Sequence, residues 1–156
     1  MFQEVEGDLF DPKWGFDAIG HGVNCEGVMG SGIAPRFRAL SEPMYQAYRE
    51  RCKTASLEAG DIFAWAPGLD SKYDYIYNMA TQIFQGPNAA YVYVVLALMN
   101  MRDHARDRGV KHIGIPLIGC GIGGLEWYRV KYLCESVFEG EENITLTAVH
   151  FVPKGV

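Results

Sequence analysis

One stretch near the N-terminus restricts the fold more than any other part of the chain. It is Ala18–Ala34, with the sequence AIGHGVNCEGVMGSGIA. Its first residues are apolar as in a buried strand, and Gly27, Gly30 and Gly32 then free the backbone for a loop that leads into a helix. The N–H groups of such a loop and the positive end of the helix bind anions. The stretch therefore predicts an anion site at the end of a buried strand.

A second loop of the same kind lies far along the chain. Residues 112–118 (HIGIPLI) form a continuous apolar run typical of a central strand, and residues 119–124 (GCGIGG) follow it directly. In α/β sheets, ligands bind at the carboxyl ends of central strands, so loops after two neighbouring strands flank one crevice. Two loops that bind through backbone N–H groups suit a diphosphate, even in a chain with a formal net charge of −5.

Three glycines of the second loop, Gly119, Gly121 and Gly124, match the GxGxxG spacing of dinucleotide-binding folds. That fingerprint belongs in an opening strand–helix–strand unit with an acidic residue about 20 residues further on. Here it is followed by room for only a single helix and strand. A nucleotide-binding oxidoreductase is therefore the less favoured interpretation.

The rest of the chain alternates strand and helix patterns, which predicts an α/β sandwich with a mixed sheet between helices. We expect strands at residues 2–5, 17–23, 61–66, 75–81, 112–118 and 144–152. We expect helices at residues 31–40, 41–55, 89–108 and 126–139, with Asn88 as an N-cap of the third.

Composition is that of an ordinary globular protein. The 156 residues are 49% hydrophobic and 21% charged, which fits one domain spanning residues 1–156. The acidic balance argues against direct nucleic-acid binding, and the basic residues between Arg36 and Lys53 are typical of a solvated helix face. The N-terminus has no signal-peptide pattern and residues 89–101 are too short to span a bilayer, so we expect a cytoplasmic protein.

The four cysteines form no CxxC pair, so the sequence predicts neither a zinc site nor a thioredoxin-like motif. We expect free thiols, no bound metal and no cofactor.

Five side chains near the expected strand ends carry candidate chemistry, each with a structural alternative. Asn24 has the groups to donate to a sugar hydroxyl or position a water, or to close a turn. Asp8 has the groups to accept from an adenine amine or to form an Asx-turn. Taken alone, Phe151 is favoured as a core residue over a base-stacking one, and His21 as a hydrogen-bonded core residue over an acid or base. Cys120 is either activated by a helix N-terminus or a small residue in a tight loop.

Together, three strings resemble the macrodomain family, in the branch that holds the DarG-type antitoxins and the terminal ADP-ribose protein glycohydrolases. They are Gly7-Asp8-Leu9, NCEGVMGSGIA at 24–34 and PLIGCGIGGLEW at 116–127, so the resemblance spans nearly the whole chain. It implies a three-layer α/β/α sandwich with a central mixed, mostly parallel sheet of about six strands. It also implies that ADP-ribose, free or attached to a macromolecule, occupies the crevice.

The resemblance gives the candidate residues a shared purpose. Asp8 and Leu9 would hold the adenine, Phe151 would stack near it, and Asn24 would face the distal ribose. The two phosphate loops would be formed by Gly30, Ser31, Gly32 and Ile33, and by Gly119, Cys120, Gly121, Ile122 and Gly123.

The chain also departs from the family pattern. The terminal ADP-ribose glycohydrolases carry a lysine before a Gly–acidic pair at the third strand and an aspartate in the second loop. Here the matching residues are 57–61 (LEAGD), with no lysine, and Gly123. Phosphatases that act on ADP-ribose 1″-phosphate carry a histidine in the second strand, which His21 matches.

The resemblance therefore implies an ADP-ribosyl hydrolase acting on a modified protein or nucleic acid, or an ADP-ribose 1″-phosphate phosphatase. Asn24 and His21 would be its catalytic residues and would orient a water. The alternative is a non-catalytic ADP-ribose reader, which the missing lysine and aspartate favour. ADP-ribosylated DNA is an acceptable substrate even though charge does not indicate direct nucleic-acid binding.

Overall fold

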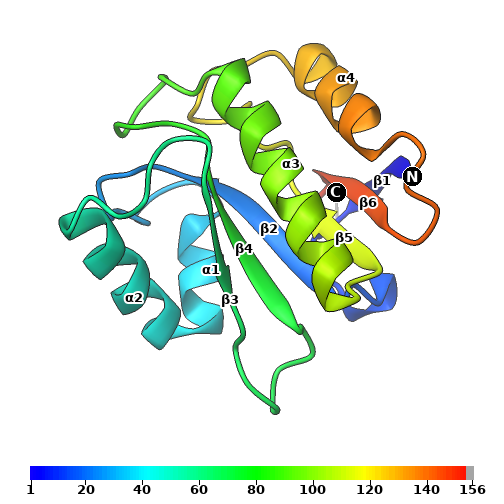
Figure 1. Cartoon of the computed structure of the whole chain (residues 1–156), viewed down its shortest axis with the longest axis horizontal. Helices are drawn as coiled ribbons and strands as arrows, with labels where there is room; N and C mark the ends of the chain where they lie inside the picture. The colour runs from blue at the N-terminus through cyan, green and yellow to red at the C-terminus, as the bar shows by residue number, and fades with distance from the viewer. Residues whose placement is uncertain (154–156) are drawn as a thin grey trace.

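The computed structural model describes residues 1–153 and is built on a six-stranded sheet in the order β1-β6-β5-β2-β4-β3 (Figure 1). Residues 154–156 of the predicted domain lie outside the described part. The strands are β1 (Phe2–Gly7), β2 (Ala18–Val23), β3 (Ile62–Trp65), β4 (Tyr75–Ala80), β5 (His112–Ile115) and β6 (Thr145–Phe151). The α-helices are α1 (Ala34–Leu40), α2 (Glu42–Lys53), α3 (Tyr91–Arg108) and α4 (Trp127–Phe138), and residues Pro12–Trp14 form a short 3-10 helix.

The sheet is mixed and mostly parallel, as expected. All neighbouring strands pair in parallel except β3, which runs antiparallel to β4 at one edge. Helices α1 and α2 cover one face, and α3 and α4 cover the other (Figure 1). The predicted three-layer α/β/α sandwich is therefore confirmed.

The two strands at the centre of the sheet separate along their length. All six residues of β2 pair with β4, but only Ala18 and Ile19 pair with β5, opposite Ile113 and Gly114. β5 ends at Ile115, while β2 continues to Val23. The sheet therefore opens at its carboxyl edge between β2 and β5.

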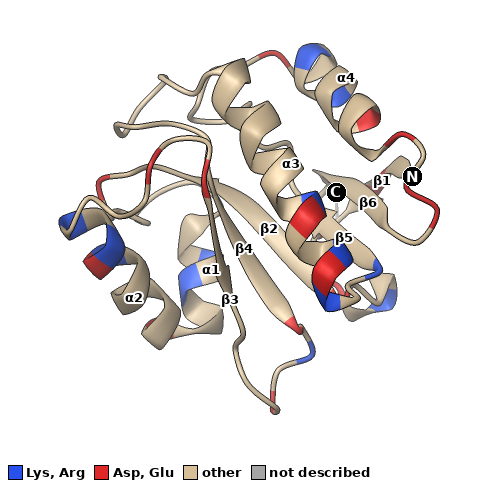
Figure 2. Ribbon diagram, in the orientation of Figure 1, with Lys and Arg blue, Asp and Glu red and all other residues tan. Residues whose placement is uncertain are grey.

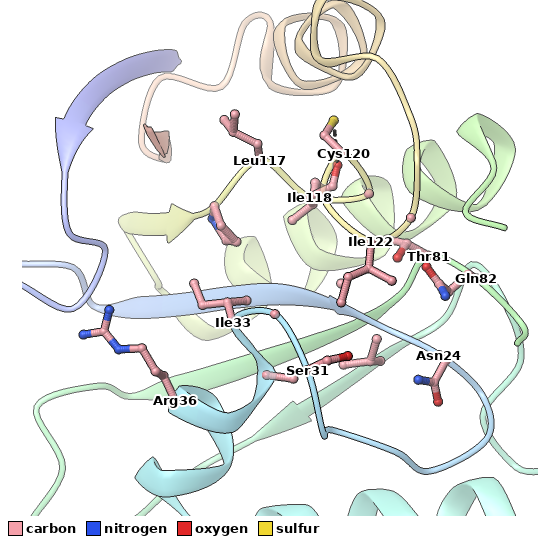
Figure 3. Close-up of a pocket in the computed structure, with 18 of the residues that line it drawn as sticks. Asn24, Ser31, Ile33, Arg36, Thr81, Gln82, Leu117, Ile118, Cys120 and Ile122 are labelled. Atoms are coloured by element: carbon pink, nitrogen blue, oxygen red, sulfur yellow. Dashed lines mark hydrogen bonds between the residues drawn. The ribbon is translucent and has the colours of Figure 1, made fainter. Parts of the chain in front are cut away.

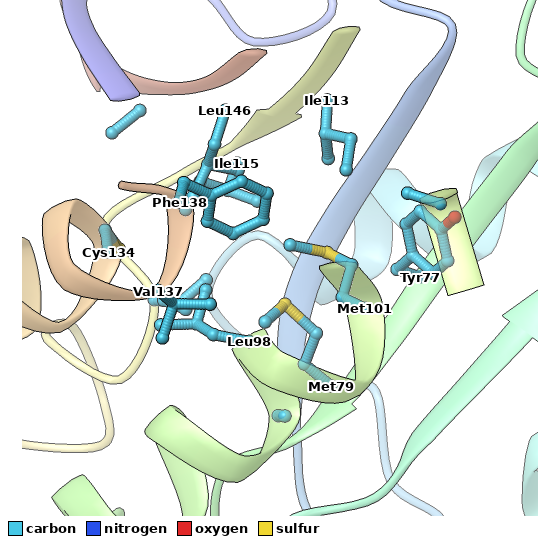
Figure 4. Packing of buried hydrophobic residues seen from close by; sticks show 14 of the residues in the cluster. Tyr77, Met79, Leu98, Met101, Ile113, Ile115, Cys134, Val137, Phe138 and Leu146 are labelled. Atoms are coloured by element: carbon cyan, nitrogen blue, oxygen red, sulfur yellow. The ribbon is translucent and has the colours of Figure 1, made fainter. Parts of the chain in front are cut away.

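Each face of the sheet has its own apolar core. Between the sheet and α3–α4, large side chains such as Met79, Leu98, Met101 and Phe138 are fully buried (Figure 4). On the other face, Phe37 of α1 and Met44 and Tyr48 of α2 pack against the apolar residues of β2. These two layers hold β2 rigidly between them.

Three expected boundaries are wrong, and two of the corrections lengthen loops. β5 ends at Ile115 instead of residue 118, because Pro116 has no N–H to continue the ladder. α1 begins at Ala34, so residues 31–33 belong to the first loop. The N-cap of α3 is Ala90, while the Asn88 side chain accepts from Phe84 N and donates to Gln85 O inside a loop.

His21 lies in the core, as expected of this residue taken alone, and its fully buried ring gives the predicted catalytic role no support. The ring is 0% exposed and stacks on Phe37 with 3.8 Å between ring centroids. Nε2 donates to Asn78 Oδ1 at 2.8 Å, and Asn78 Nδ2 donates to Phe63 O, which fixes the amide orientation. Burial lowers the pKa of His21 to about 4, partly offset by the bond to Asn78.

No helix within residues 1–153 combines the length and the apolar character needed to cross a membrane.

The burial of neutral His21 predicts a pH-dependent stability. In the unfolded chain, His21 binds a proton below its ordinary pKa of 6.5. In the folded chain, it stays neutral down to about pH 4. The free energy of unfolding should therefore fall with falling pH across this window, by roughly 3 kcal/mol through His21 alone. His21→Gln keeps an N–H donor for Asn78 but does not titrate, so it should remove this part of the fall in urea unfolding curves.

His104→Gln is the matched control. His104 is only half-buried, so desolvation should lower its pKa less than that of the fully buried His21. An equal pH dependence in wild type and His21→Gln would contradict a neutral, buried His21.

Candidate functional site

A cavity of about 660 Å³ lies where the sheet opens, at the carboxyl ends of the five parallel strands (Figure 3). Its walls are the loop after β2, the loop after β5 and the segment after β4, with contributions from the ends of β1 and β6. This volume falls within the range of roughly 300–1,000 Å³ that is typical of small-molecule sites.

Every residue predicted to bind ligand lines this cavity. They are Asp8, Leu9, Asn24, Gly30, Ser31, Gly32, Ile33, Gly119, Cys120, Gly121, Ile122, Gly123 and Phe151. Residues from four separate strand ends thus meet in one place, although contact with a ligand stays a prediction. His21 is the one candidate that the structure places elsewhere.

The two glycine loops approach each other across the cavity. Ile122 projects from the second loop toward the first (Figure 3), and its Cδ1 lies 3.1 Å from where a Cβ on Gly32 would be. Gly32 has a φ of +65°, which only glycine adopts readily. The loops therefore enclose the space between them.

Gly123 is packed too tightly to carry a side chain. A Cβ there would lie 2.6 Å from Gly119 O and 2.7 Å from Ala89 Cβ. Ala89 N also donates to Gly123 O, which ties the second loop to the segment before α3. The absence of an aspartate at this position thus has a steric cause.

Asp8 and Arg36 form an ion pair at one end of the cavity. Arg36 Nη1 and Nη2 each donate to a carboxylate oxygen of Asp8 at 3.0 Å, and the guanidinium lies over the Phe10 ring. Asp8 Oδ1 also accepts from Phe10 N, so the Asx-turn predicted as the alternative is present as well.

Phe151 is 66% exposed at the cavity rim, so the interpretation of this residue, taken alone, as a core residue was wrong.

Asn24 marks the other end of the cavity and closes the turn after β2. Its Oδ1 accepts from Glu26 N at 3.0 Å, and its Nδ2 donates to Val28 O at 3.0 Å. The side chain still lines the cavity, so the turn and the site use the same residue.

Cys120 is not an activated thiol. Burial raises the pKa of Cys120 to about 11, and its Sγ donates to Ile118 O. The prediction of a lowered pKa is wrong because α4 begins only at Trp127, after the loop has turned away.

Sequence reasoning missed four polar residues of the lining: Arg36, Thr81, Gln82 and Gln85. Thr81, Gln82 and Gln85 follow β4 as Asn24 follows β2, and that shared position was the signal available. Gln82 is almost fully buried, and its Nε2 is satisfied there because it donates to Phe84 O and Gly86 O.

The cavity holds few groups able to transfer a proton. Among the described residues that line it, the only ionised side chains are Asp8 and Arg36, which pair with each other. The segment 57–61 lies outside the lining, as does Lys53. Within residues 1–153, no three His, Cys, Asp or Glu side chains are grouped to hold a metal ion. The site therefore favours binding and orientation over acid–base chemistry.

The packing of Gly123 predicts that Gly123→Ala destabilises the protein. The added methyl must displace a backbone carbonyl, and such overpacking costs about 1–3 kcal/mol. Gly121→Ala is the matched control, because a Cβ there meets nothing within 4 Å. Thermal unfolding should show a clear fall in Tm for the first variant and little change for the second. Equal Tm values for the two variants would mean that the loop accommodates the added methyl group without loss of stability, and would contradict the prediction.

Comparison with known proteins points to one family. The model of the Macro domain family matches residues 21–134. A DNA ADP-ribosyl glycohydrolase from Thermus aquaticus is 30% identical over 144 residues, which cover 92% of this chain but 39% of that protein. The chain thus spans about two-fifths of the length of the first relatives it matches.

A shorter relative and a solved structure agree with this match. A human ADP-ribose glycohydrolase is 28% identical over 139 residues, covering 88% of this chain and 84% of that protein. The macrodomain of Mycobacterium tuberculosis DarG superposes with a TM-score of 0.86 at 28% identity, over 99% of both chains. The family match over most of the chain and this shared fold establish that the chain belongs to the Macro domain family.

Proposed function

We propose that this domain binds ADP-ribose and hydrolyses the glycosidic bond that joins it to a base of DNA. The observation that carries the proposal is that both glycine loops, Asp8 and Asn24 converge on one cavity at the carboxyl ends of the parallel strands. Proteins similar to this chain over 88–92% of its length bear the names ADP-ribose glycohydrolase and DNA ADP-ribosyl glycohydrolase. The longer of these relatives support DNA as the acceptor.

The cavity suits the parts of ADP-ribose in order. Asp8 and Leu9, with Phe151 at the rim, would hold the adenine, and a carboxylate oxygen of Asp8 would accept from its exocyclic amine. The diphosphate would lie between the glycine loops, where backbone N–H groups stabilise negative charge without a lysine. Asn24 would then meet the distal ribose and the bond to be broken.

Catalysis in such a site would come mainly from position. Water attacks the anomeric carbon of the distal ribose and releases one proton to solvent, the bond to the acceptor breaks, and the acceptor leaves with one proton taken from solvent. The enclosed loops fix the diphosphate, so the ribose and water meet in one geometry. Asn24 would donate to a ribose hydroxyl or to the water.

A non-catalytic reader of ADP-ribose is the second candidate. The specific observation in its favour is that the described lining offers no ionised side chain apart from the Asp8–Arg36 pair. The phosphatase interpretation is weaker than either, because it relied on His21, which the fold buries.

A substrate panel tests the proposal. Purified wild-type protein should release ADP-ribose from an ADP-ribosylated oligonucleotide faster than from ADP-ribosylated protein, and should not release phosphate from ADP-ribose 1″-phosphate. Asn24→Ala should lower the rate of release by about 100-fold, because the ribose loses its orientation. Calorimetry should show a smaller loss of ADP-ribose affinity, within about tenfold.

Asn143→Ala is the matched control, since Asn143 is exposed in the turn before β6, at the opposite edge of the sheet. Tight ADP-ribose binding by wild type with no product from any of the substrates would identify a reader and reject the hydrolase.

A further inference from the structure

The side chain of Asn24 has nearly all of its hydrogen-bonding capacity committed to the protein. Oδ1 accepts from Glu26 N at 3.0 Å and from the Tyr48 hydroxyl at 2.9 Å, with Val28 N further away at 3.4 Å. One hydrogen of Nδ2 is given to Val28 O. Because an amide nitrogen carries two hydrogens and the oxygen accepts about two bonds, one N–H is what remains for a ligand.

These hydrogen bonds determine which chemistry the Asn24 side chain can perform. Donors surround the Oδ1 position, so the amide oxygen must point there and the nitrogen must be the outward group. In Figure 3 the nitrogen of Asn24 is turned toward Ser31 and the oxygen away from it. Asn24 can therefore donate to a ribose hydroxyl or a water in the cavity, but its oxygen is not free to accept a proton from that water.

Among the described residues, Tyr48 is the only side chain outside the loop that hydrogen-bonds the Asn24 amide. It lies on α2, is 0% exposed, and packs in the core below the loop with Phe37 and Met44. Its hydroxyl lies 2.7 Å from the Asn24 carbonyl oxygen and 2.9 Å from Asn24 Oδ1. Its single proton is thus shared by two oxygens of the same residue, one on the backbone and one on the side chain.

The hydroxyl is a permanent donor. Burial raises the pKa of Tyr48 well above its usual range, so the hydroxyl keeps its proton at neutral pH. The other contacts of Asn24 come from its own loop, between residues 26 and 28, and would move with it. Within residues 1–153, Tyr48 is thus the only residue that connects the amide to a helix.

We propose that Tyr48 is a positioning residue for the reaction: it holds Asn24 with one amide N–H directed into the cavity. This inference rests on the proposed function, in which Asn24 meets the distal ribose. It adds that Asn24 acts as a donor only, and that the core of the α1–α2 layer sets the direction of that donor.

The test removes one oxygen atom. Tyr48→Phe keeps the ring in the core, and should lower kcat for release of ADP-ribose from an ADP-ribosylated oligonucleotide by roughly 10- to 100-fold. KM and the Kd of free ADP-ribose should change by no more than about threefold, because the loops still hold the diphosphate. Tyr45→Phe is the matched control. Tyr45 is buried on the same helix, and its ring centroid lies 3.9 Å from the Arg38 guanidinium.

The double variant separates positioning from mere stability. If Tyr48 acts through Asn24, adding Tyr48→Phe to Asn24→Ala should cause no further loss of kcat. A further loss, or a Tyr48→Phe enzyme with wild-type kcat while Asn24→Ala is impaired, would overturn the inference and leave the proposed function standing. A purely structural role would lower Tm and leave kcat of the folded protein unchanged.

A spectroscopic measurement decides the matter even without turnover. The side-chain amide signals of Asn24 in a ¹⁵N NMR spectrum are the pair missing from Asn24→Ala. They should shift in Tyr48→Phe and stay in place in Tyr45→Phe. If wild type shows no turnover, the hydrolase proposal fails while a shift of these signals still supports positioning by Tyr48. Unshifted signals in Tyr48→Phe would overturn it.

Discussion

The separation of β2 from β5 is the constraint on which the site depends. The two strands pair only at Ala18 and Ile19, and their ends then diverge. Parallel strands place all their carboxyl ends at one edge, and a gap between central strands at that edge exposes backbone N–H groups that no ladder uses. The glycine loops occupy this gap. Without the divergence, a ladder would run on to the ends of both strands and no cavity would remain.

Local sequence was a good guide wherever a pattern repeats over a few residues. Apolar runs and alternating patterns located each strand, and the glycine strings located both loops of the cavity. Local sequence did not identify contacts with distant residues. Taken alone, His21 was correctly expected in the core, but its partners there, Phe37 on α1 and Asn78 on β4, follow from no local pattern. The link between Asn24 and Tyr48 spans 24 residues and follows no periodicity.

The site depends on shape and dipoles more than on ionised groups. Its lining is mostly backbone and apolar side chains, and the single carboxylate among the described lining residues is paired with arginine. Such a site selects among ligands by whether they fit between two loops that lie close together. The loops approach each other at Ile122 and Gly32. In a chain with net charge −5, the peptide dipoles of such loops supply a local positive potential that the side chains do not.

The close packing at Gly123 has an evolutionary consequence. A single codon change would place an acidic residue at Gly123. The carbonyl of Gly119 and the methyl of Ala89 already fill that space. A lineage with this backbone would have to rebuild the loop and the start of α3 before an acid became tolerable. The backbone around Gly123 therefore disfavours a carboxylate at this position, and a change in the surrounding main chain would have to accompany it.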